Sequence, residues 1–192
     1  MTPQIALNYL WIVWAISWLA MAFWSERTAK RPNFGAELPY RIVTLVGALL
    51  LFGFVRRSYR EPLGLWSLAP GWNWVLFALC ALGFLFTWWA RIHLGRLWSG
   101  WITRKEGHRI VDSGPYGIVR HPIYTGLIAS ALATAVTKGT SVALAGAAIM
   151  TLGFWIKARL EERFLSEQLG ADAYAAYRRR VPMLLPFGPK AA

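Results

Sequence analysis

The chain has 192 residues, of which 56% are hydrophobic and 15% are aromatic, with 12 tryptophans. Its formal net charge is +12, yet the basic residues lie between apolar runs and form no separate basic domain. This composition argues against an ordinary soluble domain, and it favours anionic lipid headgroups over nucleic acid as partners of the basic residues. The single cysteine, Cys80, permits no internal disulfide and no cysteine-rich metal site.

Five apolar runs predict membrane-spanning helices, at about residues 5–25, 40–55, 72–90, 122–137 and 140–157. A helix needs roughly 20 residues, with about 17 as a lower limit, to cross a bilayer. The first and third runs meet this length readily, whereas the others depend on flanking aromatic or basic residues to reach the interfaces. The first run lacks a basic leader and a convincing cleavage site, so we expect a retained helix. The predicted fold class is an all-α integral membrane protein with five transmembrane helices.

The basic residues divide unevenly between the connections. Seventeen of the 21 lysines and arginines lie in 26–41, in 91–121 and from residue 157 onward, which five spans place on one side of the membrane. Connections rich in lysine and arginine remain in the cytoplasm. We therefore expect the N-terminus outside and the C-terminus inside, with the two longest polar segments sharing the cytoplasmic face.

The last two spans carry small residues four positions apart, which lets helix backbones approach closely in lipid. The connection Lys138-Gly139-Thr140 predicts a tight helical hairpin between them. After Trp155 the sequence becomes mixed in polarity with a helical apolar stripe, so the fifth span should continue as a cytoplasmic amphipathic helix. We expect Gly170 to end that helix and Asp172 to cap a further one, which Pro182 ends.

The junction at residues 120–122 is a candidate site. Pro122 suits the first turn of a helix, and Arg120 and His121 beside it would form an anion-attracting arrangement. The alternative is that Arg120 and His121 only anchor the helix at the interface. The three histidines lack metal-site spacing, and neither a Gly-x-Ser-x-Gly nor a Gly-x-Gly-x-x-Gly motif occurs. We therefore expect no metal, no serine-hydrolase site and no soluble-type dinucleotide domain.

Two adjacent glutamates, Glu161 and Glu162, follow the last apolar run. Neighbouring side chains on a helix point about 100° apart, so both cannot face one pocket equally. One carboxylate can then face a ligand while the other pairs with a base. Lys157 with Glu161 and Arg159 with Glu162 both have salt-bridging spacing on a helix.

Several short motifs follow one another in the second half of the chain. They lie in 94–99, 108–111, 114–116 and 120–126, at Glu161-Glu162, and in the pattern of glycine, tyrosine and proline in 170–186. This series resembles the isoprenylcysteine carboxyl methyltransferase family over roughly residues 90–187. The sequence predicts a single membrane domain, 1–192, in which 1–71 hold two N-terminal spans that match the family only in being hydrophobic. Residues 72–192 would form the methyltransferase core, with a cofactor loop at 91–121 and a C-terminal helix.

The resemblance also implies S-adenosylmethionine as cofactor, enclosed by the segment 108–126 and the C-terminal helix. The cofactor-binding residues carried over from the family are His108, Arg109, Ile110, Val111, Tyr116, His121, Pro122, Ile123, Tyr124, Glu161 and Glu162. The family's substrate-side arginine falls on Lys157, which lacks the planar fork that grips a carboxylate. Arg159 or Arg120 could supply that role instead. A carboxylate acceptor needs no base, whereas an amine or thiol would need one, with His121 as the candidate.

The expected activity is methyl transfer to a lipophilic or lipidated acceptor, favouring a carboxylate of the isoprenylcysteine type. A phospholipid amine or a small thiol is an alternative acceptor. Two further alternatives are an NADPH-dependent membrane reductase of related architecture and a non-catalytic lipid-binding protein. The expected partners are the acceptor and membrane lipids, with no obligatory protein partner. The short form resembles prokaryotic members, which implies the cytoplasmic (inner) membrane with the active site facing the cytoplasm.

Overall fold

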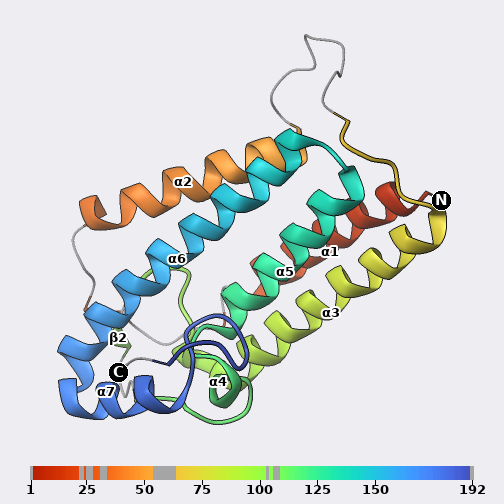
Figure 1. The fold of residues 1–192 in the computed structure, drawn as a ribbon. Helices are drawn as coiled ribbons and strands as arrows, with labels where there is room; N and C mark the ends of the chain where they lie inside the picture. The colour runs from red at the N-terminus through yellow and green to blue at the C-terminus, as the bar shows by residue number, and fades with distance from the viewer. Residues whose placement is uncertain are drawn as a thin grey trace.

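Five long helices lie side by side in the computed structural model (Figure 1), which describes residues 2–21, 24, 28–30, 34–53, 64–102, 104–105 and 109–190. They are α1 (Pro3–Met21), α2 (Phe34–Phe52), α3 (Pro70–Leu94), α5 (Pro122–Lys138) and α6 (Ser141–Leu169). Helix α2 packs on α6, α6 on α5, α5 on α3, and α3 on α1. The five predicted apolar helices therefore all form, and they make one continuous bundle.

The shorter elements gather at one end of the bundle (Figure 1). They are η1 (Gly95–Leu97), α4 (Pro115–Ile118), α7 (Ala171–Arg180) and the strands β1 (Thr28–Lys30) and β2 (Arg104–Lys105). The strands pair antiparallel, with Thr28 opposite Lys105 and Lys30 opposite Arg104. This ribbon corrects the all-α prediction in detail: extended backbone pairs where two polar connections meet outside the helices.

The predicted division of the connections agrees with this arrangement. Strand β1 pairs with β2 at the end of the bundle where α7 lies, so the three basic connections share one end. At the opposite end Gly64 pairs with Thr140, and the Leu65 amide donates to the Gly139 carbonyl at 2.7 Å. Which end faces the cytoplasm stays a prediction.

Four helices in the described part of the chain are long and apolar enough to cross a membrane. They are Pro3–Met21, Gly35–Phe52, Pro70–Leu97 and Ser141–Leu169. Helix α5 has 17 residues and is shorter than each of these. The structure thus supports four of the five predicted spans, and α5 as a fifth stays a prediction.

The predicted hairpin between α5 and α6 is confirmed. Gly139 adopts the left-handed conformation, with φ 61°, and its amide donates to the Ala135 carbonyl at 3.1 Å. Thr140 then caps α6 by accepting a hydrogen bond from the Ala143 amide at 3.2 Å. Because a glycine and a cap follow each other directly, the chain reverses between two helices over two residues.

Helix α6 continues without a break to Leu169, which confirms the predicted extension of the last apolar run. Gly170, with φ 102°, ends α6 as predicted and also precedes the first residue of α7. Asp172 therefore lies in the first turn of α7 and is not its cap, which corrects that prediction. Helix α7 ends at Arg180, two residues before Pro182.

Glycines bring α3 and α5 into backbone contact. A Cβ atom added at Gly83 would lie 2.7 Å from the Gly126 carbonyl oxygen. Gly126 in turn faces the carbonyl oxygen of Gly83. The predicted small-residue spacing of α5 thus serves close helix packing, and Ser130 adds a hydrogen bond from its Oγ to the Cys80 carbonyl at 3.0 Å.

Replacing Gly83 with alanine should lower the free energy of unfolding by about 1–3 kcal/mol, since an extra methyl forces tightly packed backbones apart. The measurement is unfolding of the purified protein in mixed detergent micelles. Gly71→Ala is the matched control, because it lies on the same helix with nothing within 4 Å of an added Cβ. Equal stability of the two variants would contradict close packing of α3 on α5.

Candidate functional site

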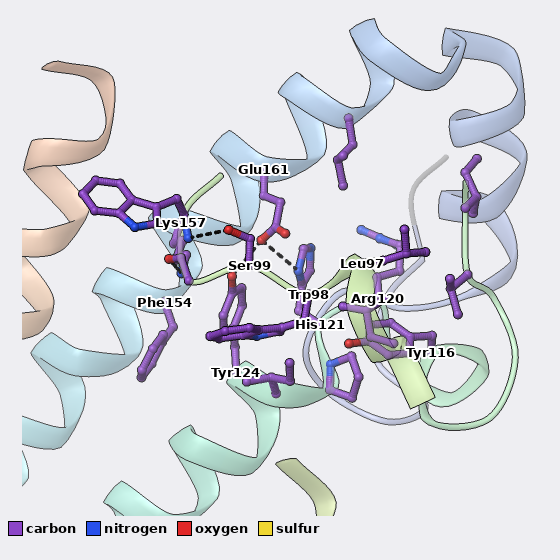
Figure 2. Close-up of a pocket in the computed structure, with 18 of the residues that line it drawn as sticks. Leu97, Trp98, Ser99, Tyr116, Arg120, His121, Tyr124, Phe154, Lys157 and Glu161 are labelled. Carbon is purple, nitrogen blue, oxygen red and sulfur yellow. Dashed lines mark hydrogen bonds and ion pairs between the residues drawn. The ribbon is translucent and has the colours of Figure 1, made fainter. Parts of the chain in front are cut away.

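A cavity of about 380 Å³ opens at the end of the bundle where the short elements gather (Figure 2). Side chains from α1, α3, α5, α6 and α7 line it, together with the segment 97–101 and the segment 109–111. Its wall is polar on the side of α6 and apolar on the side of α1 and α3. The site therefore draws on segments from nearly the whole length of the chain.

The backbone after α7 pairs with the backbone that leads into α5, next to the cavity residues Arg120 and His121. The amide of Arg120 donates to the Pro182 carbonyl at 2.9 Å, and that of His121 to the Met183 carbonyl at 3.1 Å. Thr125 Oγ1 donates to the Leu184 carbonyl at 2.6 Å. These bonds join the predicted cofactor segment to the C-terminal tail. They also occupy the amides of Arg120 and His121, which corrects the expectation of an open anion-attracting turn there.

A tyrosine of α7 also forms a hydrogen bond to the segment that leads into α5. The Tyr177 hydroxyl donates to the Tyr116 carbonyl at 2.8 Å, and both side chains are buried. Burial raises the pKa of the Tyr177 phenol, so it stays protonated and keeps donating over the physiological pH range. Helix α7 is thereby held against α4 beside the cavity.

Arg120 and Glu162 form a buried ion pair behind the polar wall. Arg120 Nε lies 2.7 Å from Glu162 Oε1, and the two side chains are each 4% exposed. The Arg120 guanidinium also donates to the carbonyls of Arg178 and Val181. Arg120 thus reaches the cavity with its Nε and Nη1 donors already engaged, and Glu162 lies behind the wall and does not line it.

The polar wall is centred on Glu161, which reaches from α6 toward α5 (Figure 2). Tyr124 donates from its hydroxyl to Glu161 Oε2 at 2.7 Å, and His121 Nδ1 lies 3.9 Å from the same oxygen. The rings of His121 and Tyr124 stack with centroids 5.3 Å apart and an interplanar angle of 9°. His121 Nε2 lies 3.2 Å from Glu162 Oε1, so the imidazole sits between two carboxylates. One glutamate faces the cavity and the other pairs with a base, as their adjacency implied.

The side chains of Lys157 and Arg159 lie on different faces of α6, although the two residues are only two positions apart. Lys157 lines the cavity, with Nζ 5.2 Å from the Tyr124 ring centroid and 3.1 Å from the Gly100 carbonyl. Arg159 does not line the cavity; its guanidinium lies 5.5 Å from the Trp155 ring centroid on another face of α6. Of these two basic residues of α6, Lys157 is therefore the one that lines the cavity with Glu161.

The apolar wall is built from tryptophans and leucines. Trp18 of α1 meets Trp98 edge to face, with ring centroids 5.4 Å apart. The fully buried Arg91 holds this wall in place, since its guanidinium lies 4.3 Å from the Trp98 ring centroid and donates to the carbonyls of Met21 and Trp24. Arg91 thereby ties the end of α1 to α3.

Residues 74–167, which include most of this site, match the model of the isoprenylcysteine carboxyl methyltransferase (ICMT) family. This part of the chain belongs to the ICMT family. The match covers α5 and most of α3 and α6, and it leaves out α1, α2 and α7. The ICMT match therefore includes Glu161, Tyr124 and His121, while Trp18 and Tyr177 come from outside it.

Three proteins of known name show what this chain is similar to. Protein-S-isoprenylcysteine O-methyltransferase B of Arabidopsis thaliana is 34% identical over 87 residues, 45% of this chain and 44% of that protein. Cobalt-zinc-cadmium resistance protein CzcN of Cupriavidus metallidurans is 33% identical over 147 residues, 76% and 60% of the two chains. Methanethiol S-methyltransferase 1 of Bradyrhizobium diazoefficiens is 42% identical over 72 residues, 38% and 24%. The matched segments span less than two thirds of each of these relatives.

The structure brings nine of the cofactor-binding residues predicted from the ICMT resemblance to one cavity: Arg109, Ile110, Val111, Tyr116, His121, Pro122, Ile123, Tyr124 and Glu161. Two others differ. His108 lies outside the described residues, and Glu162 is placed behind the wall. Among the described residues, no group of three or more His, Cys, Asp or Glu side chains could hold a metal ion.

Sequence reasoning did not single out several residues that line the cavity, among them Trp18, Phe154 and Leu127. Phe154 stacks on Tyr124 with ring centroids 5.5 Å apart. Each belongs to an apolar run in which membrane helices carry many such residues. The only local signal was the high number of aromatic residues near the end of the first apolar run. Such residues also fit the belt of aromatic side chains that membrane helices carry at the membrane–water interface.

Proposed function

We propose that the protein is a membrane methyltransferase that uses S-adenosylmethionine and acts on a lipophilic acceptor. The observation that carries this proposal is the cavity itself, in which Glu161, Tyr124 and Lys157 face an apolar wall of tryptophans. Most of the residues that line the cavity lie in the part of the chain that matches the ICMT family, and the C-terminal tail is hydrogen-bonded to the segment that leads into α5.

The residues of the cavity fit such a cofactor. Glu161 presents a partly exposed carboxylate that can accept hydrogen bonds from amino or hydroxyl groups. Tyr124 and Tyr116 offer aromatic rings, which attract a positive charge such as that of a sulfonium. When bound, S-adenosylmethionine supplies the methyl group for an in-line displacement that needs neither a metal nor a covalent enzyme intermediate.

For a carboxylate acceptor, the task of the protein is orientation. A carboxyl group has a pKa near 4 in water, so at neutral pH the acceptor is already ionised and needs no base. Lys157 is the residue we assign to hold it, because Arg120 is engaged with Glu162 and Arg159 lies outside the cavity. A lysine offers a point charge without a planar fork, so it selects less strictly for a carboxylate than arginine does.

A thiol acceptor is the second candidate. A thiol has a pKa of about 8.5 in water, so a base must take its proton at neutral pH. His121 lines the cavity with Nδ1 toward Glu161, while Nε2 lies within hydrogen-bonding distance of Glu162. This geometry favours His121 as that base. The similarity to a methanethiol S-methyltransferase is consistent with such an acceptor.

The proposal places the active site at the cytoplasmic face of a prokaryotic inner membrane, with the N-terminus outside. It takes α5 as a fifth span, although 17 residues extend only about 25 Å. That length is short of the roughly 30 Å hydrocarbon core, and flanking residues or local thinning of the bilayer would make up the difference. Membrane lipids surround the helices, and the apolar tail of the acceptor would lie between them.

Isothermal titration of the purified protein with S-adenosylhomocysteine and with NADPH tests the proposal. We expect binding of S-adenosylhomocysteine alone, because the cavity pairs a carboxylate with aromatic faces. Binding of NADPH alone would support a reductase in its place. Binding of neither would support a non-catalytic lipid-binding protein.

A further inference from the structure

A second hollow, of about 340 Å³, lies between α6 and α7, apart from the methyltransferase cavity. Its lining, which we call the arginine hollow, consists of Arg159, Glu162, Arg163, Ser166, Glu167 and Arg178. Arg159, Arg163 and Ser166 are spaced by four and three residues, so they follow one face of α6. Arg178 reaches the hollow from α7.

The arginine hollow carries a net positive charge, even after the charges of its two glutamates are taken into account. Glu162 is already balanced by Arg120, whose Nε lies 2.7 Å from it. Three arginines then face one further carboxylate, that of Glu167 at an exposed position. Arg178 Nε is 3.5 Å from Glu162 Oε2, a distance longer than a strong hydrogen bond, so this guanidinium retains donors for another anion.

The chemistry of the hollow fits a phosphate group. Guanidinium groups bind phosphate through two parallel hydrogen bonds, and several of them around one hollow can surround its oxygens. The Ser166 hydroxyl adds a further donor. A lipid phosphodiester presents two charged terminal oxygens and two ester oxygens, so donors from more than one guanidinium can reach it.

The position of the hollow along α6 matches the headgroup layer of a bilayer. Trp155 is 44% exposed, and tryptophans concentrate at the membrane interface. The Arg159 guanidinium lies 5.5 Å from the ring centroid of Trp155, and Arg163 follows one turn later. The arginines therefore begin where the apolar part of α6 ends.

We infer that the arginine hollow binds the phosphate group of an anionic membrane lipid. The site is separate from the methyltransferase cavity and does not depend on the proposed reaction. The two sites share one neighbour, however, because Glu162 lines the hollow and also contacts Arg120 and His121 of the cavity. A lipid bound there would fasten the end of α6 and α7 to the membrane surface.

Native mass spectrometry of the full chain in detergent, with phosphatidylglycerol or phosphatidylcholine added, tests the inference. We expect the protein to bind phosphatidylglycerol more tightly, and Arg163→Gln to reduce that binding about tenfold, since the change removes charge-assisted hydrogen bonds to the phosphate. Arg179→Gln is the matched control, because Arg179 is exposed on α7 and does not line the hollow. Arg159→Gln serves as a second variant should Arg163→Gln fail to purify as a monodisperse protein.

Three results would overturn the inference. Equal loss in Arg163→Gln and Arg179→Gln would show a general surface charge without a site. Equal affinity for the two lipids would show that the phosphatidylglycerol charge is not recognised. Submillimolar binding of inorganic phosphate that Arg163→Gln removes, without a lipid preference, would make the hollow a free-anion site. No methyl donor enters this experiment, so its failure would leave the proposed function standing.

Discussion

Replacing Glu161 with glutamine should weaken the binding of S-adenosylhomocysteine by about 10- to 100-fold. The Glu161 carboxylate faces the cavity beside Tyr124 and is the acceptor that the polar wall presents to a ligand. Hydrogen bonds to a charged group contribute about 1.5–3 kcal/mol, and 1.4 kcal/mol corresponds to a factor of ten. Glutamine keeps the shape of the side chain and removes its charge, so the loss reports the carboxylate. Isothermal titration measures it.

Glu167→Gln is the control for this experiment, because Glu167 lies on the same helix and outside the cavity. Its affinity should match that of the unchanged protein. If the two variants bind equally well, Glu161 serves only as a partner of Tyr124 and the cofactor assignment of this wall is wrong.

Replacing Glu162 with alanine should lower the free energy of unfolding by about 3–5 kcal/mol, since it leaves the Arg120 charge buried without its carboxylate. Both side chains are nearly inaccessible, and Arg120 joins the start of α5 to the last turn of α7 and to Val181 after it. Unfolding in mixed detergent micelles measures the effect. The loss should exceed that of any exposed carboxylate on α6.

Two further variants separate the ion pair from general effects of the substitution. Glu162→Gln keeps an acceptor for Arg120 and should cost less than Glu162→Ala. Glu167→Ala, at an exposed position of the same helix, should change stability by no more than about 0.5 kcal/mol. A Glu162→Ala variant as stable as Glu167→Ala would show that the pair does not hold the tail in place.

The helices were predictable because their signal is local. Each apolar run became a helix, and the stripe after Trp155 correctly predicted that α6 continues past the apolar run. The prediction of Asp172 as a cap was wrong because a capping residue and an acidic residue in the first turn look alike in sequence. The backbone shows that Gly170 is the N-cap of α7, so Asp172 lies in its first turn. The ribbon of β1 and β2 was not foreseen, since it joins two short polar segments more than 70 residues apart.

The candidate site was predictable where motifs are contiguous and not where partners are distant. The segment 109–124 and Glu161 came from the family resemblance. Spacing along α6 suggested Arg159 as the partner of Glu162, yet the structure pairs Glu162 with Arg120, 42 residues away. Arg91 gave no sign of burial in the sequence, because two of its acceptors are the carbonyls of Met21, at the end of α1, and of Trp24, just beyond it.

An experimental structure of the protein with S-adenosylhomocysteine tests the central claim most directly. We predict density for the ligand in the cavity between the segment 109–124 and α6, with a polar atom in hydrogen-bonding contact with Glu161. Density for the ligand at another place, or a cavity that stays empty while the ligand is bound in solution, would contradict the proposed site.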